Sequence, residues 1–133
     1  MAIYRLDKFI YQLIFDDILN SMLENALKNM FPYKELSLSE GEILSINESF
    51  YFIQDGIVQG TFGNKVPVKF ECSQNEIFGL RQLIDNNFEI KTLQIKKSIK
   101  LLSFHHEDFN KMLQGTDKNI VVFLKSLIQH GTF

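Results

Sequence analysis

The residues that could do chemistry gather in the stretch NEIFGLRQLIDNNFE, residues 75–89. An apolar strand end leads into Phe78 and Gly79, and a short helix-like turn follows, as at the opening of a phosphate-binding loop. A buried phosphate needs a guanidinium fork and backbone N–H groups in place of its water. The stretch is therefore either a ligand site or a turn that only connects two elements.

Other reactive side chains lack the spacing that catalysis requires. His105 and His106 are adjacent, so they diverge on a strand or on a helix, and we expect solvated or capping histidines and no metal site. Cys72 is the single cysteine, which excludes an internal disulfide and an iron–sulfur centre, and its apolar strand predicts a small buried hydrophobe. The sequence contains no G-x-S-x-G, GxGxxG or GxxxxGK motif. We therefore predict no catalytic residue and no cofactor, and we do not expect an enzyme.

Length and charge narrow the class of protein. The 133 residues fit a single domain over residues 1–133, with 45% hydrophobic residues for its core. The net charge of −2 gives no basic field for nucleic acid or for an anionic membrane. No uncharged apolar stretch reaches the about 18 residues of a membrane span, and residues 1–20 contain three aspartates and no cleavage site for a secretion signal. With its lone cysteine, the chain is expected in the reducing cytoplasm.

The N-terminal segment, residues 1–31, is helical by its apolar period. Apolar residues recur at steps of three and four between residues 4 and 30, which is typical of amphipathic helix. Ser21 with Glu24 forms a capping-box pattern, so we expect a second helix to begin there. Pro32 then ends the helix.

The middle segment, residues 32–104, changes to short apolar runs separated by turn signals. Runs of this length predict about eight strands in an antiparallel sandwich or barrel. Asp55-Gly56 is the clearest hairpin turn, because both residues tolerate positive φ. A second hairpin tip is predicted around four lysines, Lys91, Lys96, Lys97 and Lys100. The interior is expected to be filled by phenylalanines, namely Phe50, Phe52, Phe62, Phe70, Phe78, Phe88 and Phe104.

The C-terminal segment, residues 105–133, returns to helix. Asp117 can cap a final helix whose apolar stripe runs from Ile120 to Ile128. Such a stripe is not expected to stay exposed. It either packs back on the strands or meets a second copy of the chain.

The order of helix, strands and helix resembles the regulatory domain of the Crp/Fnr family. Four stretches carry the likeness, namely LSEGEILS (38–45), FYFIQDGIVQG (50–60), NEIFGLRQLI (75–84) and IKLLSFHHEDFNKML (99–113). The resemblance implies a mainly β fold with flanking helices, a double-stranded β-helix (jelly roll) of the cyclic-nucleotide-binding-domain type. It also implies that the final helix is a dimer helix.

The resemblance makes residues 78–89 the phosphate-binding cassette, but a degenerate one. In the family a glutamate directly after "FG" bonds the ribose, and an arginine about ten residues later pairs with the cyclic phosphate. Here the ribose position is Leu80, and the arginine position falls at or next to Glu89. A carboxylate about 4 Å from a phosphate costs on the order of 4 kcal/mol at an effective dielectric near 20. Arg81 is expected to point outward, so Phe78, Gly79, Leu80, Arg81 and Glu89 are not expected to bind cAMP; the stretch is a connecting turn or a site for another ligand.

The resemblance also implies the partners. A homodimer would use the final helix, with Val121, Leu124, Leu127 and Ile128 in the interface. The DNA-binding members continue into a helix-turn-helix, whereas this chain ends at Phe133. We therefore expect either the effector-sensing and dimerisation domain of a longer regulator, which would bind DNA only through a missing C-terminal domain, or a stand-alone β-roll module for protein interaction. This chain alone is not expected to bind nucleic acid or membrane.

Overall fold

The structure is a computed structural model that describes residues 22–44, 48–63, 65–85 and 88–131. The chain divides into two compact units, Met1–Met30 and Phe31–Phe133. In the first unit residues 22–30 form a helix, in agreement with the helix predicted to begin at the capping box. An i, i+4 ion pair joins Lys28 Nζ to Glu24 Oε1 at 3.7 Å on this helix. The helix predicted before residue 20 lies outside the described residues.

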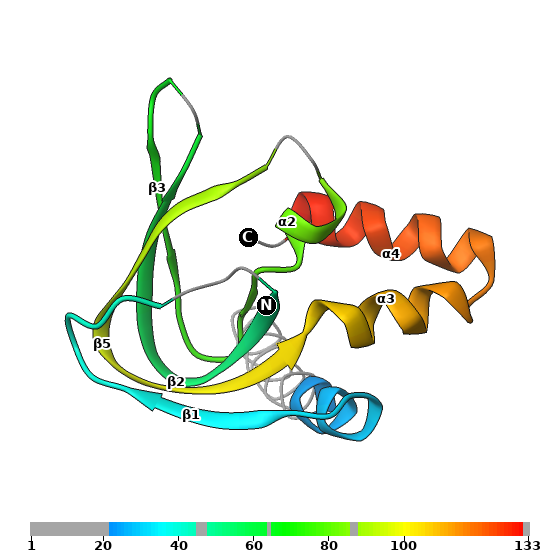
Figure 1. The fold of residues 1–133 in the computed structure, drawn as a ribbon, viewed down its shortest axis with the longest axis horizontal. Coiled ribbons are helices and arrows are strands. Elements are labelled where there is room, and N and C mark those ends of the chain that lie inside the picture. The colour runs from blue at the N-terminus through cyan, green and yellow to red at the C-terminus, as the bar shows by residue number, and fades with distance from the viewer. Residues whose placement is uncertain (1–21, 45–47, 64, 86–87, 132–133) are drawn as a thin grey trace, which may run out of the picture. The chain divides into compact units, whose positions relative to one another are not determined.

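The second unit is an antiparallel roll followed by a helical hairpin (Figure 1). Its elements are β1 (Lys34–Leu38), β2 (Ser49–Phe62), β3 (Val68–Cys72), β4 (Ile77–Phe78), α2 (Arg81–Ile84), β5 (Ile90–His105), α3 (His106–Gln114) and α4 (Lys118–Gly131). The strand order is β1-β5-β2-β3, and β4 pairs with β2. The mainly β fold with flanking helices is confirmed, but the described residues form five strands instead of about eight.

The difference in strand number has its cause at Asp55-Gly56, where the predicted hairpin turn is wrong. β2 runs for 14 residues through this dipeptide, and its register against β5 shifts on both sides of Asp55. Gly56 has φ 102°, so the positive φ expected of a turn is used to bend the strand. The irregular pairing continues to Ile57 and Lys97, and β2 and β5 remain paired on both sides of it, so two long strands stand where the sequence predicted several shorter ones. The lysines of β5 are therefore exposed along a strand and do not form a hairpin tip.

The interior of the roll is apolar. Its buried residues, joined in one cluster, are Tyr51, Ile53, Val58, Phe70, Cys72, Phe78, Leu93, Ile95, Ile99 and Leu101. Phe78 comes from β4, and the others come from β2, β3 and β5, mostly from alternate positions, as expected when one face of each strand is buried. The rings of Tyr51 and Phe78 stack with centroids 5.1 Å apart, which holds β4 to β2.

A second apolar layer lies on the other face of β2 and β5, which corrects the prediction that all the phenylalanines fill the interior. Phe50, Phe52 and Phe104 are buried, but they alternate with the interior residues and so face the opposite side. Phe50 and Phe104 stack with centroids 5.0 Å apart. Phe31 and Phe109 meet Phe50 edge-on at 5.9 Å and 5.8 Å, so α3 covers this face. Fully burying such a ring contributes roughly 1.5–3 kcal/mol.

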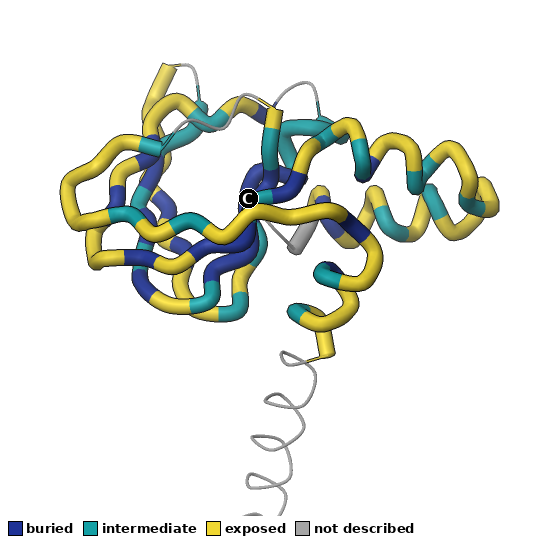
Figure 2. The backbone as a smooth tube through the Cα atoms, turned by 60° about the horizontal axis from the view of Figure 1, so that its bottom comes forward, coloured by how far each residue is buried: buried dark blue, intermediate teal, exposed yellow. Residues whose placement is uncertain are grey.

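The helical hairpin of α3 and α4 projects from one side of the roll, and its outer surfaces are exposed (Figure 2). α4 lies beside α2, and Ile128 of α4 is buried. Within the described ranges, no helix is both long enough and apolar enough to cross a membrane.

Candidate functional site

The candidate site is the turn from β4 into α2. β4 pairs through Phe78 and Ile77 with Tyr51 and Phe52 of β2, which fixes the entrance to the turn. Gly79 has φ 96°, a left-handed conformation that other residues rarely adopt, and it reverses the chain there. Leu80 follows and is 5% exposed. A buried apolar side chain therefore follows Gly79 directly in this turn.

Arg81, the first residue of α2, is held by its neighbours and does not point outward as expected. Its guanidinium carbon lies 4.3 Å from the centroid of the Phe88 ring. Its Nε lies 4.0 Å from Asp85 Oδ2, one turn along the chain. The ring and the carboxylate both favour the positive charge of the guanidinium at this position.

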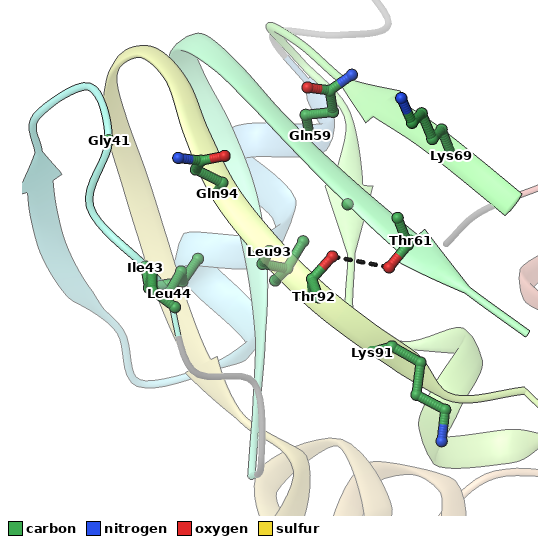
Figure 3. Close-up of a pocket in the computed structure, with 11 residues that line it drawn as sticks. Gly41, Ile43, Leu44, Gln59, Thr61, Lys69, Lys91, Thr92, Leu93 and Gln94 are labelled. Carbon is green, nitrogen blue, oxygen red and sulfur yellow. Dashed lines mark hydrogen bonds between the residues drawn. The ribbon is translucent and has the colours of Figure 1, made fainter. Parts of the chain in front are cut away.

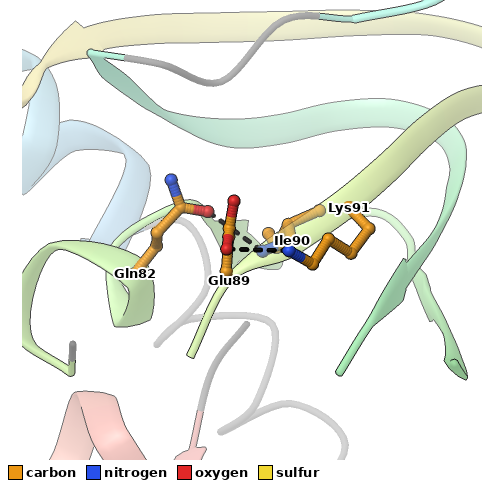
Figure 4. A network of polar contacts seen from close by, with 4 residues as sticks. All are labelled: Gln82, Glu89, Ile90 and Lys91. Carbon is orange, nitrogen blue, oxygen red and sulfur yellow. Dashed lines mark hydrogen bonds and ion pairs between the residues drawn. The ribbon is translucent and has the colours of Figure 1, made fainter. Parts of the chain in front are cut away.

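Glu89 does not face the interior. Its side chain is 63% exposed, and its Oε2 accepts a hydrogen bond from Lys91 Nζ at 2.9 Å (Figure 4). The repulsion between a phosphate and this carboxylate, which the sequence suggested, would therefore act across solvent and be weak. At the same place Gln82 Oε1 accepts a hydrogen bond from the backbone N–H of Ile90 at 3.1 Å. This bond ties α2 to the start of β5.

Next to the turn, the rings of three phenylalanines pack together, namely Phe62, Phe70 and Phe88. The centroid of Phe62 lies 6.0 Å from that of Phe70 and 5.0 Å from that of Phe88. Phe70 reaches over Gly60, where an added Cβ would lie 2.6 Å from its Cζ. The ring thus takes the volume that a side chain at position 60 would occupy. Phe70 and Phe88 are buried as predicted, and Phe62 is partly buried.

His106 also contacts the turn, and the sequence did not predict this role. Its Nε2 lies 2.9 Å from the carbonyl oxygen of Gly79, and its backbone N–H donates to the carbonyl of Glu48 at 2.9 Å. Its ring is parallel to that of Phe50 with centroids 6.4 Å apart. Burial lowers the pKa of His106, although the bond to Gly79 and the nearby Glu48 act in the opposite direction. The neutral ring therefore donates from Nε2 to the Gly79 carbonyl. The only sequence signal was a histidine at the junction of a strand and a helix.

Cys72 lies in the interior of the roll with 1% exposure, as predicted for a small hydrophobe. Burial raises the pKa of its thiol to about 12, and the charge of Glu76 adds to the effect. A thiol that stays protonated is a poor nucleophile and a poor metal ligand.

No protein-family model matches the sequence, and no curated protein matches it. Solved structures do. The sensor domain of the transcriptional regulator DNR from Pseudomonas aeruginosa superposes with a TM-score of 0.58 at 16% identity, over 71% of this chain and 72% of that one. The regulatory domain of Toxoplasma gondii PKA, in complex with cAMP, gives a TM-score of 0.55 at 15% identity, over 71% of this chain and 38% of that one. The chain has the fold of the cyclic-nucleotide-binding regulatory domains.

The EAL enzyme Bd1971, in its cAMP-bound form, contains the same cyclic-nucleotide-binding-type fold. Its TM-score is 0.57 at 18% identity, and the match covers 71% of this chain. It covers only 27% of the enzyme, so this chain spans about a quarter of that protein. The jelly roll predicted from the Crp/Fnr resemblance is confirmed by these structures.

Proposed function

We propose that this chain is a non-enzymatic regulatory domain, of the kind that senses an effector and dimerises in Crp/Fnr-like regulators, whose nucleotide pocket is degenerate. The observation that carries the proposal is the chemistry of the turn between β4 and α2. The buried side chain of Leu80 offers no acceptor to a ribose hydroxyl. The guanidinium of Arg81 is held over Phe88 beside Asp85. A cyclic nucleotide entering here would lose its hydration without receiving the polar partners that offset the loss.

Calorimetric titration with cAMP and with cGMP tests this proposal. We expect no saturable heat for either nucleotide at concentrations up to about 1 mM, which corresponds to a binding free energy weaker than about −4 kcal/mol. A thermal melt of the same sample shows that the protein is folded. A saturable curve in the micromolar range would refute the degenerate pocket.

We further propose that the domain is a homodimer formed through α4. The resemblance supports this arrangement, and so does the exposure of apolar side chains on this helix. Ile120, Phe123 and Leu127 recur at steps of three and four and are 52%, 63% and 53% exposed. Exposed apolar residues that share one helix face are typical of an interface.

The four interface residues inferred from the resemblance differ in how far they are buried. Ile128 is buried and Val121 and Leu124 are half-buried, so these three pack within their own chain. Leu127 is exposed and can meet a partner. The dimer proposed here therefore centres on Phe123 and Leu127.

Sedimentation velocity tests the dimer. The unmodified chain is expected to sediment as a dimer, and Phe123→Glu should give a folded monomer because it places two like charges close to the two-fold axis. Gln129→Glu is the matched control, since it adds one negative charge at another exposed position of α4 and should leave the dimer intact. A monomer at all protein concentrations would contradict the dimer.

A monomer would instead favour the second candidate, a stand-alone β-roll module that presents the same face of α4 to a different protein. The two candidates also differ at the level of the gene. A reading frame that continues past Phe133 into a helix-turn-helix supports the sensing domain of a longer regulator, in which DNA binding belongs to the additional domain. In either case we propose that the chain acts in a reducing compartment such as the cytoplasm, where Cys72 stays a thiol.

A further inference from the structure

A groove of about 610 Å³ opens along β2 and β5 beside residues 41–44, and Leu93 of the interior cluster and Leu44, which packs against that cluster, are among its lining residues. Its polar side chains lie on the face of β2 and β5 opposite the buried residues Val58 and Ile95. Residues 41–44 extend this sheet, because Gly41 N–H donates to the Ile95 carbonyl at 2.9 Å and Ile95 N–H donates to the Glu42 carbonyl at 3.0 Å. The volume is within the range of sites for small molecules.

The floor of the groove is a ladder of polar side chains in register (Figure 3). Gln59 pairs with Gln94, and Thr61 pairs with Thr92, across β2 and β5. Because side chains two apart on a strand share a face, the four groups lie together on the outer surface. The two threonine hydroxyls are 2.7 Å apart and share one hydrogen bond, so each keeps capacity for another partner. Two amides and two hydroxyls can donate and accept at once, which is the pattern that sugar hydroxyls require.

The charges along the groove favour an anion. Lys69 stands on β3 directly opposite Thr61, is exposed, and is in no ion pair among the described residues. Lys91 also lines the groove, where its charge is shared with Glu89. The neighbouring carboxylate of Glu71 is already paired with Lys96. No carboxylate is among the described residues that line the groove, so the ammonium of Lys69 has no competitor there.

One wall of the groove is apolar. Ile43 forms a bridge with Gln94 and is 83% exposed beside the polar ladder. A sugar ring has hydroxyls at its edge and C–H groups on its face, so it can contact the ladder and Ile43 together. None of the described lining residues is aromatic, which disfavours a nucleobase, since bases are usually held by stacking.

We propose that this groove binds a small polyhydroxylated anion, of the class of sugar phosphates and sugar acids. The anionic group pairs with Lys69, the hydroxyls bond to Gln59, Gln94 and the threonine pair, and the ring face packs on Ile43. The proposal concerns the outer surface of the roll and does not depend on what the turn between β4 and α2 binds.

An NMR titration of the ¹⁵N-labelled protein tests the proposal with four probes, which are glucose 6-phosphate, glucuronate, glucose and inorganic phosphate. Both sugar anions are expected to shift the amide signals of residues 59–61 and 92–94 saturably, with a dissociation constant of about 1 mM or a few times higher. Glucose and inorganic phosphate should each bind more weakly, since each has half of the required chemistry. Tighter binding of glucose 6-phosphate or of glucuronate then shows whether the anionic group is a phosphate or a carboxylate.

Three variants locate the site. Lys69→Gln should weaken both sugar anions about fivefold and leave glucose unchanged, as expected for an exposed charge pair. Gln94→Ala should weaken all the sugars. Lys97→Gln is the matched control for Lys69→Gln, because it removes an exposed charge from β5 outside the groove and should change nothing. The proposal is overturned if no sugar anion gives saturable shifts at these amides, if inorganic phosphate binds as well as glucose 6-phosphate, or if Lys69→Gln has no effect in a folded protein.

Discussion

A substitution of Gly56 would test the bend on which the whole roll depends. Gly56 and Gly41 both have positive φ, 102° and 88°, but their surroundings differ. A Cβ at position 56 would lie 2.5 Å from the carbonyl oxygen of Ser98 and 2.7 Å from the Cα of Ile99, both backbone atoms of β5. A Cβ at position 41 would meet nothing within 4 Å. The pair therefore separates the cost of backbone conformation from the cost of contact.

The magnitudes follow from these two costs. A left-handed conformation costs a residue other than glycine about 1–2 kcal/mol, so Gly41→Ala should lower the free energy of unfolding by about that amount. Gly56→Ala adds a clash with backbone that cannot rotate away, and overpacking of this kind typically costs a further ~1–3 kcal/mol. We therefore expect a total loss of about 2–5 kcal/mol for Gly56→Ala.

Urea unfolding followed by circular dichroism measures both losses, with equal m-values as the sign that the unfolded states are comparable. Equal losses for the two variants would refute the reasoning, because they would mean that β2 and β5 do not approach each other closely at the bend.

The remaining predictions concern buried side chains. Phe52 has no exposed surface, so Phe52→Ala should lower the free energy of unfolding by about 3–5 kcal/mol. A urea melt that shows a much smaller loss would place this side chain at the surface. The pKa of His106 is lowered in the folded protein, so on acidification the unfolded chain takes up a proton at this residue first. The contribution of His106 to the free energy of unfolding is therefore full above the ordinary histidine pKa of about 6.5 and is lost as the pH falls below that value. Urea melts between pH 7.5 and 5.5 should accordingly show a steeper loss of stability for the unmodified protein than for His106→Gln, and parallel losses would contradict this assignment. Cys72, with a thiol pKa of about 12, should resist iodoacetamide at pH 8 in the native protein and react after unfolding, whereas rapid native alkylation would show an accessible thiolate.

Much of the fold could be predicted from the sequence, because apolar spacing reports which faces are buried. The alternation of Val66, Val68, Phe70 and Cys72 predicts that the four side chains share one face of a strand. Phe70 and Cys72 lie inside the roll, whereas Val66, before β3, and Val68, its first residue, are exposed. Asp55-Gly56 shows the limit of such reasoning. A dipeptide that tolerates positive φ serves equally in a two-residue turn and in a bulge, and the choice is made by the partner strand, which lies far along the chain.

The candidate site was harder to predict, because its chemistry depends on orientation. Residue types alone showed that the turn lacks the family's glutamate, and burial of Leu80 agrees with that inference. They did not show that Arg81 folds over Phe88, or that Glu89 turns to Lys91 in solvent. The contact of Arg81 with Phe88 joins residues on either side of residue 85, where Phe88 N–H donates to the Asp85 carbonyl at 3.1 Å, and the contact of Glu89 with Lys91 depends on where two exposed side chains turn. Single contacts of this kind leave no periodic signal in a sequence.

The contacts of the turn bear on how the regulatory domain that we propose could transmit a signal. His106, the first residue of α3, is hydrogen-bonded to the Gly79 carbonyl, and Gln82 of α2 is hydrogen-bonded to Ile90 of β5. In addition, α2 lies beside α4. An effector that displaces the turn must therefore either break the hydrogen bond between His106 and the Gly79 carbonyl or displace α3 as well. A net neutral hydrogen bond contributes about 0.5–1.5 kcal/mol, so breaking this one lies within the differential binding energy of a weak ligand. If the turn binds no nucleotide, as we propose, a displacement of the turn would still reach α4 through its contact with α2. α4 carries the face through which we propose that two copies associate.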